Sequence, residues 1–400
     1  KQEELVRQPV YNRNLAELMR YASGQFVNVL SRNDANWGAY AGLGPKYNTY
    51  LLDGLPIDSF VDPMSLDLQA IERIEMQKGP ASVLYANYLS MDFAGNETPL
   101  AGTTNLVLRS HVDTPLRRVE AGLGNDGLVL GKLYTQGRSG DLSYMAGLSS
   151  ERADYTQYGE PGSWLQTTEN PDYAKTKAFA KLSYALGDPR HSISMFMHQT
   201  RHDGDLGRPN RDFGHRYETY NLTYNNQIHP RWHMQFKAGE RRYDRRFDND
   251  NFPANLNLAS QDTTQQTLRP VDLTLSYVHG EDSLLTVGID RQSVDYHTET
   301  RPAGGATSPR NDASATSRGV FVQEKLRLDD WVLRLGLRHN TIEHEYDLLG
   351  GVVPATNAAK WQKTLWSAGV RNNLSPGFFL FANVGTSFMV PSAKQIGGAD

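Results

Sequence analysis

The sequence predicts a transmembrane antiparallel β-barrel that encloses a small N-terminal α+β plug domain. Three observations support this fold class: apolar and polar residues alternate with a period of two after about residue 116, short turns alternate with long connections, and no apolar run is long enough for a membrane-spanning helix. Such a helix needs about 20 consecutive apolar residues. A chain without one can span a bilayer only as a closed barrel of strands.

The alternation is clearest in the second part of the chain. Residues 271–277, 285–290 and 331–338 place apolar and polar side chains in strict turn. Successive side chains of a strand point to opposite faces, so each segment is predicted to have one apolar and one polar face. A soluble β-sandwich has the same pattern, and the alternation by itself leaves both folds open.

The connections between these strands favour the membrane barrel. Short and long connections alternate, with tight turns at 139–140, 187–189, 229–230, 279–281, 329–330 and 375–377 and long connections at about 154–175, 203–214, 246–266, 298–317 and 346–363. Outer-membrane barrels have short periplasmic turns, longer extracellular loops and strands of about ten residues. We count about thirteen strands, the last near Phe378–Phe388. Because an odd number does not close a single-chain bacterial barrel, we expect the C-terminal strands to be missing.

Composition excludes several classes of protein. The 41 Lys and Arg residues are offset by 45 Asp and Glu residues, which argues against a nucleic-acid partner. The chain has no cysteine, so a disulfide framework, a thiolate metal site and a cysteine nucleophile are excluded. Tyrosine (20) exceeds phenylalanine (14), a bias that is typical of side chains at a membrane–water boundary.

We predict no catalytic residue, no metal site and no cofactor. Gly122–Gly127 has the glycine spacing of a dinucleotide site, but that site needs a helix after it and residues 128–133 look like a strand. Asn125–Gly127 instead predicts a hairpin turn. His198 and His202 have the spacing of a helical metal pair, but on a strand they would lie about 13 Å apart. An enzyme is therefore not expected.

The first 110 residues are organised differently from the rest. Asn14 can cap a helix that includes Leu15–Met19, and Ser65–Ile71 can form a short helix or turn before a strand at Ile74–Lys78. This mixture predicts a plug domain at residues 1–110 and a barrel domain at residues 111–400.

Four segments resemble the TonB-dependent outer-membrane receptors. Three lie in the first part, Tyr50–Pro56, Ile71–Tyr85 and Pro99–Val107, and the fourth, Leu380–Phe388 with Pro391 and Ser392 after it, is similar to a mid-barrel strand of that family. The resemblance implies a barrel of about 22 strands with a plugged lumen in the bacterial outer membrane. It also implies active import of a ferric siderophore, with the TonB energy-coupling complex, outer-membrane lipid and lipopolysaccharide as partners.

Other functions stay open beside siderophore import. The ligand of such a receptor can instead be haem, cobalamin or an oligosaccharide, and a plugged barrel can also serve as an adhesin or a structural protein. Two features depart from the family: residues 86–98 form a longer and more aromatic connection than usual, and we find no energy-coupling box near the N-terminus.

The strand that contains Ile71–Lys78 is expected to separate two environments. Its apolar side chains Ile71, Ile74 and Met76 can face the core of the plug. Its charged side chains, which include Glu72, Arg73, Glu75 and Lys78, are expected to pair with charges on the barrel wall, as the resemblance implies. Ordinary solvated surface is the alternative interpretation of these charges.

The resemblance places the ligand between the plug apex and the long loops. By matching positions the apex is Gly42–Tyr47 with the loop around Phe60, and the expected contacts are Tyr40, Lys46, Tyr47 and Phe60. Aromatic rings and guanidinium groups on the loops and in the basic run at 241–246 suit an anionic iron chelate. The expected contacts there are Trp164, Arg201, Arg208 and Arg241. These arginines could instead pair with nearby aspartates or bind lipopolysaccharide phosphates.

Overall fold

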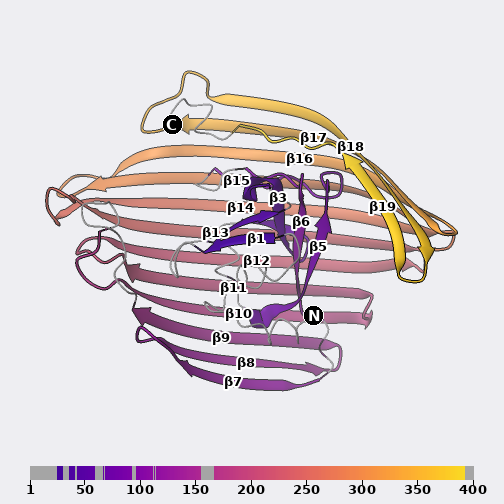
Figure 1. Cartoon of the computed structure of the whole chain (residues 1–400), viewed down its shortest axis with the longest axis horizontal. Coiled ribbons are helices and arrows are strands. Elements are labelled where there is room, and N and C mark those ends of the chain that lie inside the picture. Colours follow the sequence, from indigo (N-terminus) through magenta and orange to yellow (C-terminus); the bar gives the residue numbers. More distant parts are fainter. Residues whose placement is uncertain are drawn as a thin grey trace.

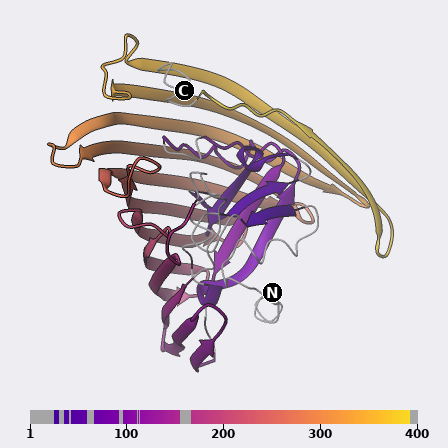
Figure 2. The ribbon, with the colours of Figure 1, turned by 60° about the vertical axis from the view of Figure 1, so that its left-hand side comes forward.

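The computed structural model describes residues 25–29, 36–40, 43–58, 66, 68–91, 96–110, 112, 114–154 and 166–391. They form a large curved sheet with a smaller sheet against its concave side (Figure 1 and Figure 2). We call strands β7 to β19 the wall, and we call the elements from β1 to β6 with the residues that connect them the plug. The helix expected at Leu15–Met19 lies outside the described residues.

The wall consists of thirteen antiparallel strands in which each strand pairs with its neighbours in sequence. This confirms the predicted number of strands and their antiparallel pairing. The strands are β7 (Leu116–Leu123), β8 (Val129–Ser139), β9 (Leu142–Asp154), β10 (Asp172–Asp188), β11 (His191–Asp205), β12 (Asp212–His229), β13 (Trp232–Asp250), β14 (Leu258–His279), β15 (Ser283–Pro302), β16 (Ser308–Leu328), β17 (Trp331–Leu348), β18 (Ala358–Ser375) and β19 (Phe378–Gly385).

The tight turns are confirmed, but the connections at the other end are shorter than predicted. Gly140, Gly187, Gly280 and Gly377 have positive φ at the turns, with values of 58°, 84°, 58° and 84°. At the opposite end, which we call the loop end, β11 to β18 are joined through residues 206–211, 251–257, 303–307 and 349–357. The strands continue past the apolar part of the wall, where both faces are polar and the period of two is lost. The prediction of long loops at 203–214, 246–266, 298–317 and 346–363 is therefore wrong for the parts of these ranges that lie in strands.

The hairpin between β7 and β8 confirms that the glycine-rich segment at 122–127 is a turn. Asp126 and Gly127 have φ values of 57° and 64°, and the N–H of Gly124 donates to the carbonyl of Leu128 at 2.9 Å. No helix follows in the described chain, because β8 begins at Val129. A dinucleotide site is thereby excluded at this position.

The outward face of the wall carries an apolar belt. Large apolar side chains are exposed there on successive strands, for example Ile193, Ile289, Val320, Leu335 and Leu337. The same parity on each strand places these residues away from the plug, as a wall in contact with lipid requires.

Charged side chains replace the belt toward the loop end of the outward face. Four arginines there pair with an acid two residues away on the same strand: Arg201 with Asp203, Arg216 with Glu218, Arg242 with Glu240 and Arg246 with Asp248. Arg269 on β14 differs, because it pairs with Glu240 on β13 at 2.8 Å and with Asp295 on β15 at 2.5 Å.

The plug is built around a four-stranded sheet in the order β4-β3-β6-β5. Strands β3 and β6 are parallel, and the other two pairs are antiparallel. The elements of the plug are β1 (Gln25–Val29), β2 (Asn36–Tyr40), the 3₁₀ helix η1 (Pro45–Tyr47), β3 (Asn48–Leu52), β4 (Leu55–Ile57), the 3₁₀ helix η2 (Leu68–Ala70), β5 (Ile71–Lys78) and β6 (Gly102–Leu108). The short helix expected before the strand is thus η2, although β5 begins earlier than predicted. Within the described part of the chain, no helix has the length and hydropathy to cross a membrane.

The Asp53–Gly54 motif forms the two-residue turn between β3 and β4. Both residues have positive φ, 50° and 85°, as a type I′ hairpin turn requires, and Asp-Gly is a favoured pair for it. A Cβ atom at Gly54 would lie 2.2 Å from Nζ of Lys237 on β13, so the turn approaches the wall closely. The motif therefore both reverses the chain and brings the plug against the wall.

Two apolar clusters join the plug to the wall. The first contains Tyr50, Leu52 and Ile71 of the plug, with Phe179 and Phe196 of the wall among its other members. In the second, side chains of residues 88–91 pack against β14 to β17. The plug therefore makes apolar contacts with two separate parts of the wall.

We predict that Leu335→Arg destabilises the folded protein by about 2–4 kcal/mol in lipid, because arginine in the middle of the apolar belt must leave water. Thr341→Arg, which lies further along the same face of β17, is expected to cost about 0–1 kcal/mol. The measurement is reversible unfolding by denaturant in lipid vesicles. Equal costs at the two positions would contradict the assignment of the outward face.

Candidate functional site

The candidate site lies between the plug and the inward face of β10 to β13. Inward side chains on these strands form three layers from the loop end to the short-turn end. On β10 the layers are represented by Lys175 and Lys177 (upper), Phe179 (middle), and Lys181 and Ser183 (lower), all of them buried. Because successive side chains of a strand point to opposite faces, all five of these residues point inward.

The upper layer combines imidazole, aromatic and cationic side chains. The ring centroid of His202 lies 5.0 Å from that of Phe213 and 6.0 Å from that of His215, and His215 lies 5.0 Å from Phe247. The layer also includes the lysines of β10 and further side chains of β12 and β13: Tyr217, Tyr243 and Arg245, with Arg241 at its boundary with the middle layer. Such a surface can bind an anionic ligand through charge-assisted hydrogen bonds and ring contacts.

The middle layer is apolar and seals the plug against the wall. Phe179 and Phe196 are 4% and 1% exposed, and they belong to the same cluster as the core of the plug sheet. Tyr134 on β8 lies 6.2 Å from Phe179 between ring centroids. This layer separates the upper layer from the space below it.

The lower layer borders a polar cavity of about 300 Å³. Its wall side is formed by side chains near the tight turns, and its plug side includes residues of β5, β6 and the β3–β4 turn; the lining includes Ser183, Ser192, Ser194, Asn225, Gln235 and Lys237. Serine, amide and lysine groups can all hydrogen-bond to water or to a polar ligand.

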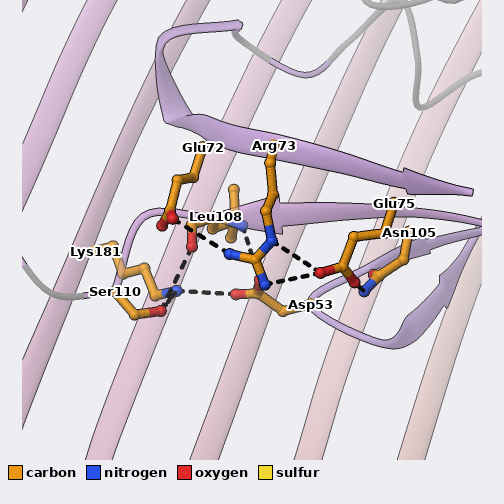
Figure 3. Close-up of polar contacts among 8 residues, drawn as sticks. All are labelled: Asp53, Glu72, Arg73, Glu75, Asn105, Leu108, Ser110 and Lys181. Atoms are coloured by element: carbon orange, nitrogen blue, oxygen red, sulfur yellow. Dashed lines mark hydrogen bonds and ion pairs between the residues drawn. The ribbon is translucent and has the colours of Figure 1, made fainter. Parts of the chain in front are cut away.

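An ion pair between Asp53 and Lys181 joins the plug to the wall beside this cavity (Figure 3). Oδ2 of Asp53 lies 2.9 Å from Nζ of Lys181, whose side chain is 3% exposed. Lys181 also donates to Oγ of Ser110 at 2.8 Å, and the N–H of Leu108 donates to Oδ1 of Asp53 at 2.8 Å. Since Leu108 ends β6, the carboxylate of Asp53 ties two plug strands to the wall at one point.

Three charged side chains of β5, those of Glu72, Arg73 and Glu75, pair with one another within the plug. Arg73 donates to Glu75 at 2.8 Å and to Glu72 at 3.2 Å, and Asn105 donates to Glu75 at 3.2 Å (Figure 3). The hydrogen bond to Glu75 is the main reason that the pKa of Arg73 is raised above its ordinary value. The expected pairing of this run with the wall is therefore not what the structure shows for Arg73. Asp53 of the β3–β4 turn, which lies outside this run, does pair with the wall.

Residues 81–91 and 96–98, which we call the strap, fix the plug to the opposite part of the wall. The N–H of Leu89 donates to Gln292 on β15 at 2.7 Å, and the N–H of Met91 donates to Gln266 on β14 at 3.0 Å. Near β19, the side chain of Asn87 donates to the carbonyl of Phe388 at 2.8 Å. The connection that departs from the family pattern thus packs against the wall.

The predicted apex residues fall into three groups. Tyr40 ends β2, and its side chain is not described; Phe60, like Trp164 of the loops, lies outside the described residues. Lys46 and Tyr47 lie in η1, where their carbonyl groups accept hydrogen bonds from Thr98 at 2.8 Å and Ala101 at 2.7 Å. Lys46 is exposed and Tyr47 is partly buried. Contact of these side chains with a ligand stays a prediction.

The three predicted arginines lie in different surroundings. Arg241 is on the inward face of β13 and is 3% exposed. The strand register aligns it through Thr219 and His198 with Phe179, at the boundary between the upper and middle layers. Arg208, at the loop end, forms a buried ion pair with Asp250 at 2.7 Å and lies over the ring of Phe252 at 4.4 Å from its centroid. Arg201 points outward and pairs with Asp203, so the structure does not bring it together with Arg241.

Sequence reasoning missed the lysines that line the inward face. Lys175, Lys177 and Lys181 all lie on β10 and differ by even numbers, which places them on one face of a strand. The intervening positions are small or apolar, so this pattern could have identified the inward face. Among the described residues, no group of three or more His, Asp or Glu side chains is placed to hold a metal ion.

Family models match both parts of the chain. Residues 143–399 match the model described as TonB dependent receptor-like, beta-barrel, and residues 1–88 match the TonB-dependent Receptor Plug Domain. None of the curated protein sequences compared with the chain matches it.

Several solved structures share this fold at low sequence identity. The copper transporter OprC has a TM-score of 0.73 and 14% identity, over 93% of this chain and 60% of that chain. FpvA of P. aeruginosa, in an iron complex with a heterologous pyoverdine, has a TM-score of 0.71 and 15% identity, over 92% of this chain and 54% of that chain. The siderophore receptor PiuA from Acinetobacter baumannii has a TM-score of 0.68 and 12% identity, over 90% of this chain and 60% of that chain. The chain thus covers 54% to 60% of the length of these three proteins.

We predict that Asp53→Asn weakens the attachment of the plug sheet by about 3 kcal/mol, because Lys181 then stays buried without its carboxylate. Asparagine retains an oxygen that can accept from Leu108, so the loss reports mainly the charge. Hydrogen exchange of the β3 and β6 amides should become about a hundredfold faster.

The double variant Asp53→Asn/Lys181→Met provides the control for this change. It removes the buried charge as well, and it should recover most of the lost protection. If exchange is as fast in the double variant as in Asp53→Asn, the ion pair does not hold the plug.

Proposed function

The chain belongs to the family of TonB-dependent receptors of the bacterial outer membrane, and from this premise we propose that it binds and imports a ferric siderophore. Family membership accounts for the plug and the wall. The identity of the ligand is our proposal, and it rests on the chemistry of the upper layer.

The observation that carries the proposal is the concentration of cationic and aromatic groups on the inward face near the loop end. Lys175, Lys177, Arg241 and Arg245 project from β10 and β13 toward the interior, beside the rings around His215. A ferric chelate with carboxylate, catecholate or hydroxamate groups presents oxygen acceptors and planar surfaces. Guanidinium groups bind the oxygen acceptors through charge-assisted hydrogen bonds, and aromatic rings contact the planar surfaces.

Similarity of fold is consistent with this ligand class. FpvA was solved with a pyoverdine and iron, and PiuA is named a siderophore receptor. At 15% and 12% identity these relatives support the architecture, so the assignment of a siderophore to this chain rests on its own upper layer. Copper, the cargo named for OprC, belongs in the same binding experiment as an alternative.

Import requires the middle layer to open, because Phe179 and Phe196 are packed against the plug below the upper layer. We propose that the TonB complex supplies the energy for this step by acting on the plug. The wall has no comparable freedom, since its backbone hydrogen bonds cannot be exchanged for water within lipid.

We predict that Arg241→Met lowers the affinity for an anionic ferric chelate about tenfold to a hundredfold, the loss of one hydrogen bond to a charged group. The purified receptor is titrated with a panel of ferric siderophores, haem, cobalamin and copper(II), and binding is followed by tryptophan fluorescence. Arg216→Met, an outward arginine on β12, is the matched control and should leave the affinity unchanged.

Binding of at least one ferric siderophore with the expected difference between the two variants would support the proposal. Absence of binding across all ferric siderophores, or selective binding of haem, cobalamin or copper, would overturn the siderophore assignment. An equal loss in both variants would show that the effect is not due to the inward face.

A further inference from the structure

The polar cavity below the middle layer has no role in binding a ligand that arrives from the loop end. We propose that it is a transit site, which takes a hydrophilic ligand after that ligand has left the upper layer, and that the ion pair of Asp53 and Lys181 is its latch. The inference rests on the proposed function in one respect: it assumes a ligand that moves from the loop end to the short-turn end.

The position of the cavity at the short-turn end supports a role in transit. Ser183 and Ser192 flank the tight turn between β10 and β11, and Asn225 and Gln235 flank the next one, between β12 and β13. The cavity is therefore at the short-turn end, and the aromatic pair Phe179 and Phe196 separates it from the upper layer. A ligand that moves along the inward face of β10 and β11 would enter it next.

The polar and charged groups that line the cavity suit a hydrophilic ligand. Hydroxyl and amide groups line its wall side, and charged groups of both signs, including Arg73, Glu75 and Lys237, border it. These groups can pair with the hydroxyl, amide and carboxylate groups of a hydrophilic ligand, as they can with water. An apolar ligand would leave them unpaired, at a cost that disfavours binding.

The cavity is small, so a large hydrophilic ligand would need it to widen. A volume of about 300 Å³ is the lower limit for small-molecule sites, which span about 300–1,000 Å³. The β3–β4 turn forms part of its border, because Asp53 lines the cavity and Gly54 lies against Lys237. Movement of this turn away from the wall would enlarge the space.

The polar contacts that the β3–β4 turn and the strap make with the wall are arranged differently. At the turn, the polar contacts of Asp53 with the wall converge on one side chain, Lys181, which also binds Ser110. The strap is held along its length by hydrogen bonds from backbone and side chain to β14, β15 and the residues after β19. Two further hydrogen bonds join the plug to the wall on the side of the turn, from Lys177 to the carbonyl of Leu66 at 3.2 Å and from Arg109, just after β6, to Gln136 on β8 at 2.7 Å. Neither involves the turn itself. Loss of the ion pair with Lys181 is therefore expected to release the turn before the strap, which has several hydrogen bonds to lose.

The first test measures whether water reaches the cavity. Because the chain contains no cysteine, a single one can be introduced at a chosen place. Ser194→Cys lies in the cavity lining, and Ala315→Cys lies in the apolar cluster under the strap as the control. A small charged thiol reagent should modify the first at least about tenfold faster, and addition of Asp53→Asn should raise that rate by about another tenfold.

The outcome decides the inference whether or not the ligand has been identified. Slow modification at both positions would show that the cavity is closed to solutes and would overturn the transit site. Unchanged modification of Ser194→Cys after Asp53→Asn would overturn the role of the ion pair as a latch.

The second test locks each side of the plug in cells that produce the receptor. Asp53→Cys/Lys181→Cys, joined by a short bifunctional thiol reagent, ties the turn to the wall. Ser82→Cys/Ser387→Cys, where the hydroxyl oxygens now lie 2.8 Å apart, can form a disulfide that ties the strap. Each is compared with the same variant before cross-linking.

We expect the lock at the turn to stop uptake of the ferric siderophore while binding at the cell surface is retained. The lock at the strap should leave both unchanged. Uptake that survives the first lock, or that is stopped by the second, would overturn the inference. A receptor that binds no ferric siderophore would instead refute the proposed function, and the thiol experiment would still decide the inference.

Discussion

Lipid offers no hydrogen-bond partner to a backbone, so each strand of the wall depends on its neighbours for its N–H and C=O groups. The up-and-down order of β7 to β19 satisfies this requirement by pairing each strand with the next in sequence. With the backbone paired, a period of two sends alternate side chains to lipid and to the interior. The inward face can therefore carry charged and aromatic groups. The upper layer, the middle layer and the lining of the cavity all lie on it.

The interior then imposes a second requirement, because a charge that is buried must find a partner. Lys181 is buried between wall and plug and finds one in Asp53. Arg338 on β17 has a similar solution, with Asp290 on β15 at 2.7 Å. The first pair positions the plug as well as stabilising it, because Lys181 on the wall specifies where the carboxylate of Asp53 must lie, whereas the second pair joins two strands of the wall.

Local patterns allowed the strand number, the tight turns and the hairpin turn at Asn125–Gly127 to be predicted, because each depends on residues close in sequence. The ends of the strands could not be located this way, since pairing continues where both faces are polar. Contact between Asp53 and Lys181 joins residues far apart in the chain, and no spacing predicts it. The orientation of Arg201 was accessible, however: it shares the parity of Ile193, Met195 and Met197, which are exposed and apolar.

The outward ion pairs also bear on how the strands find their alignment. An arginine that pairs two residues along its own strand, such as Arg201 or Arg216, is satisfied in any alignment with the neighbouring strand. A slip of two residues would keep each of these side chains on the same face and in its pair. Arg269 is different, because its partners Glu240 and Asp295 lie on the strands to either side. One side chain thus specifies the register of β13, β14 and β15, while β11 and β12 must take theirs from the tight turns that join them to β10 and β13 and from the inward face.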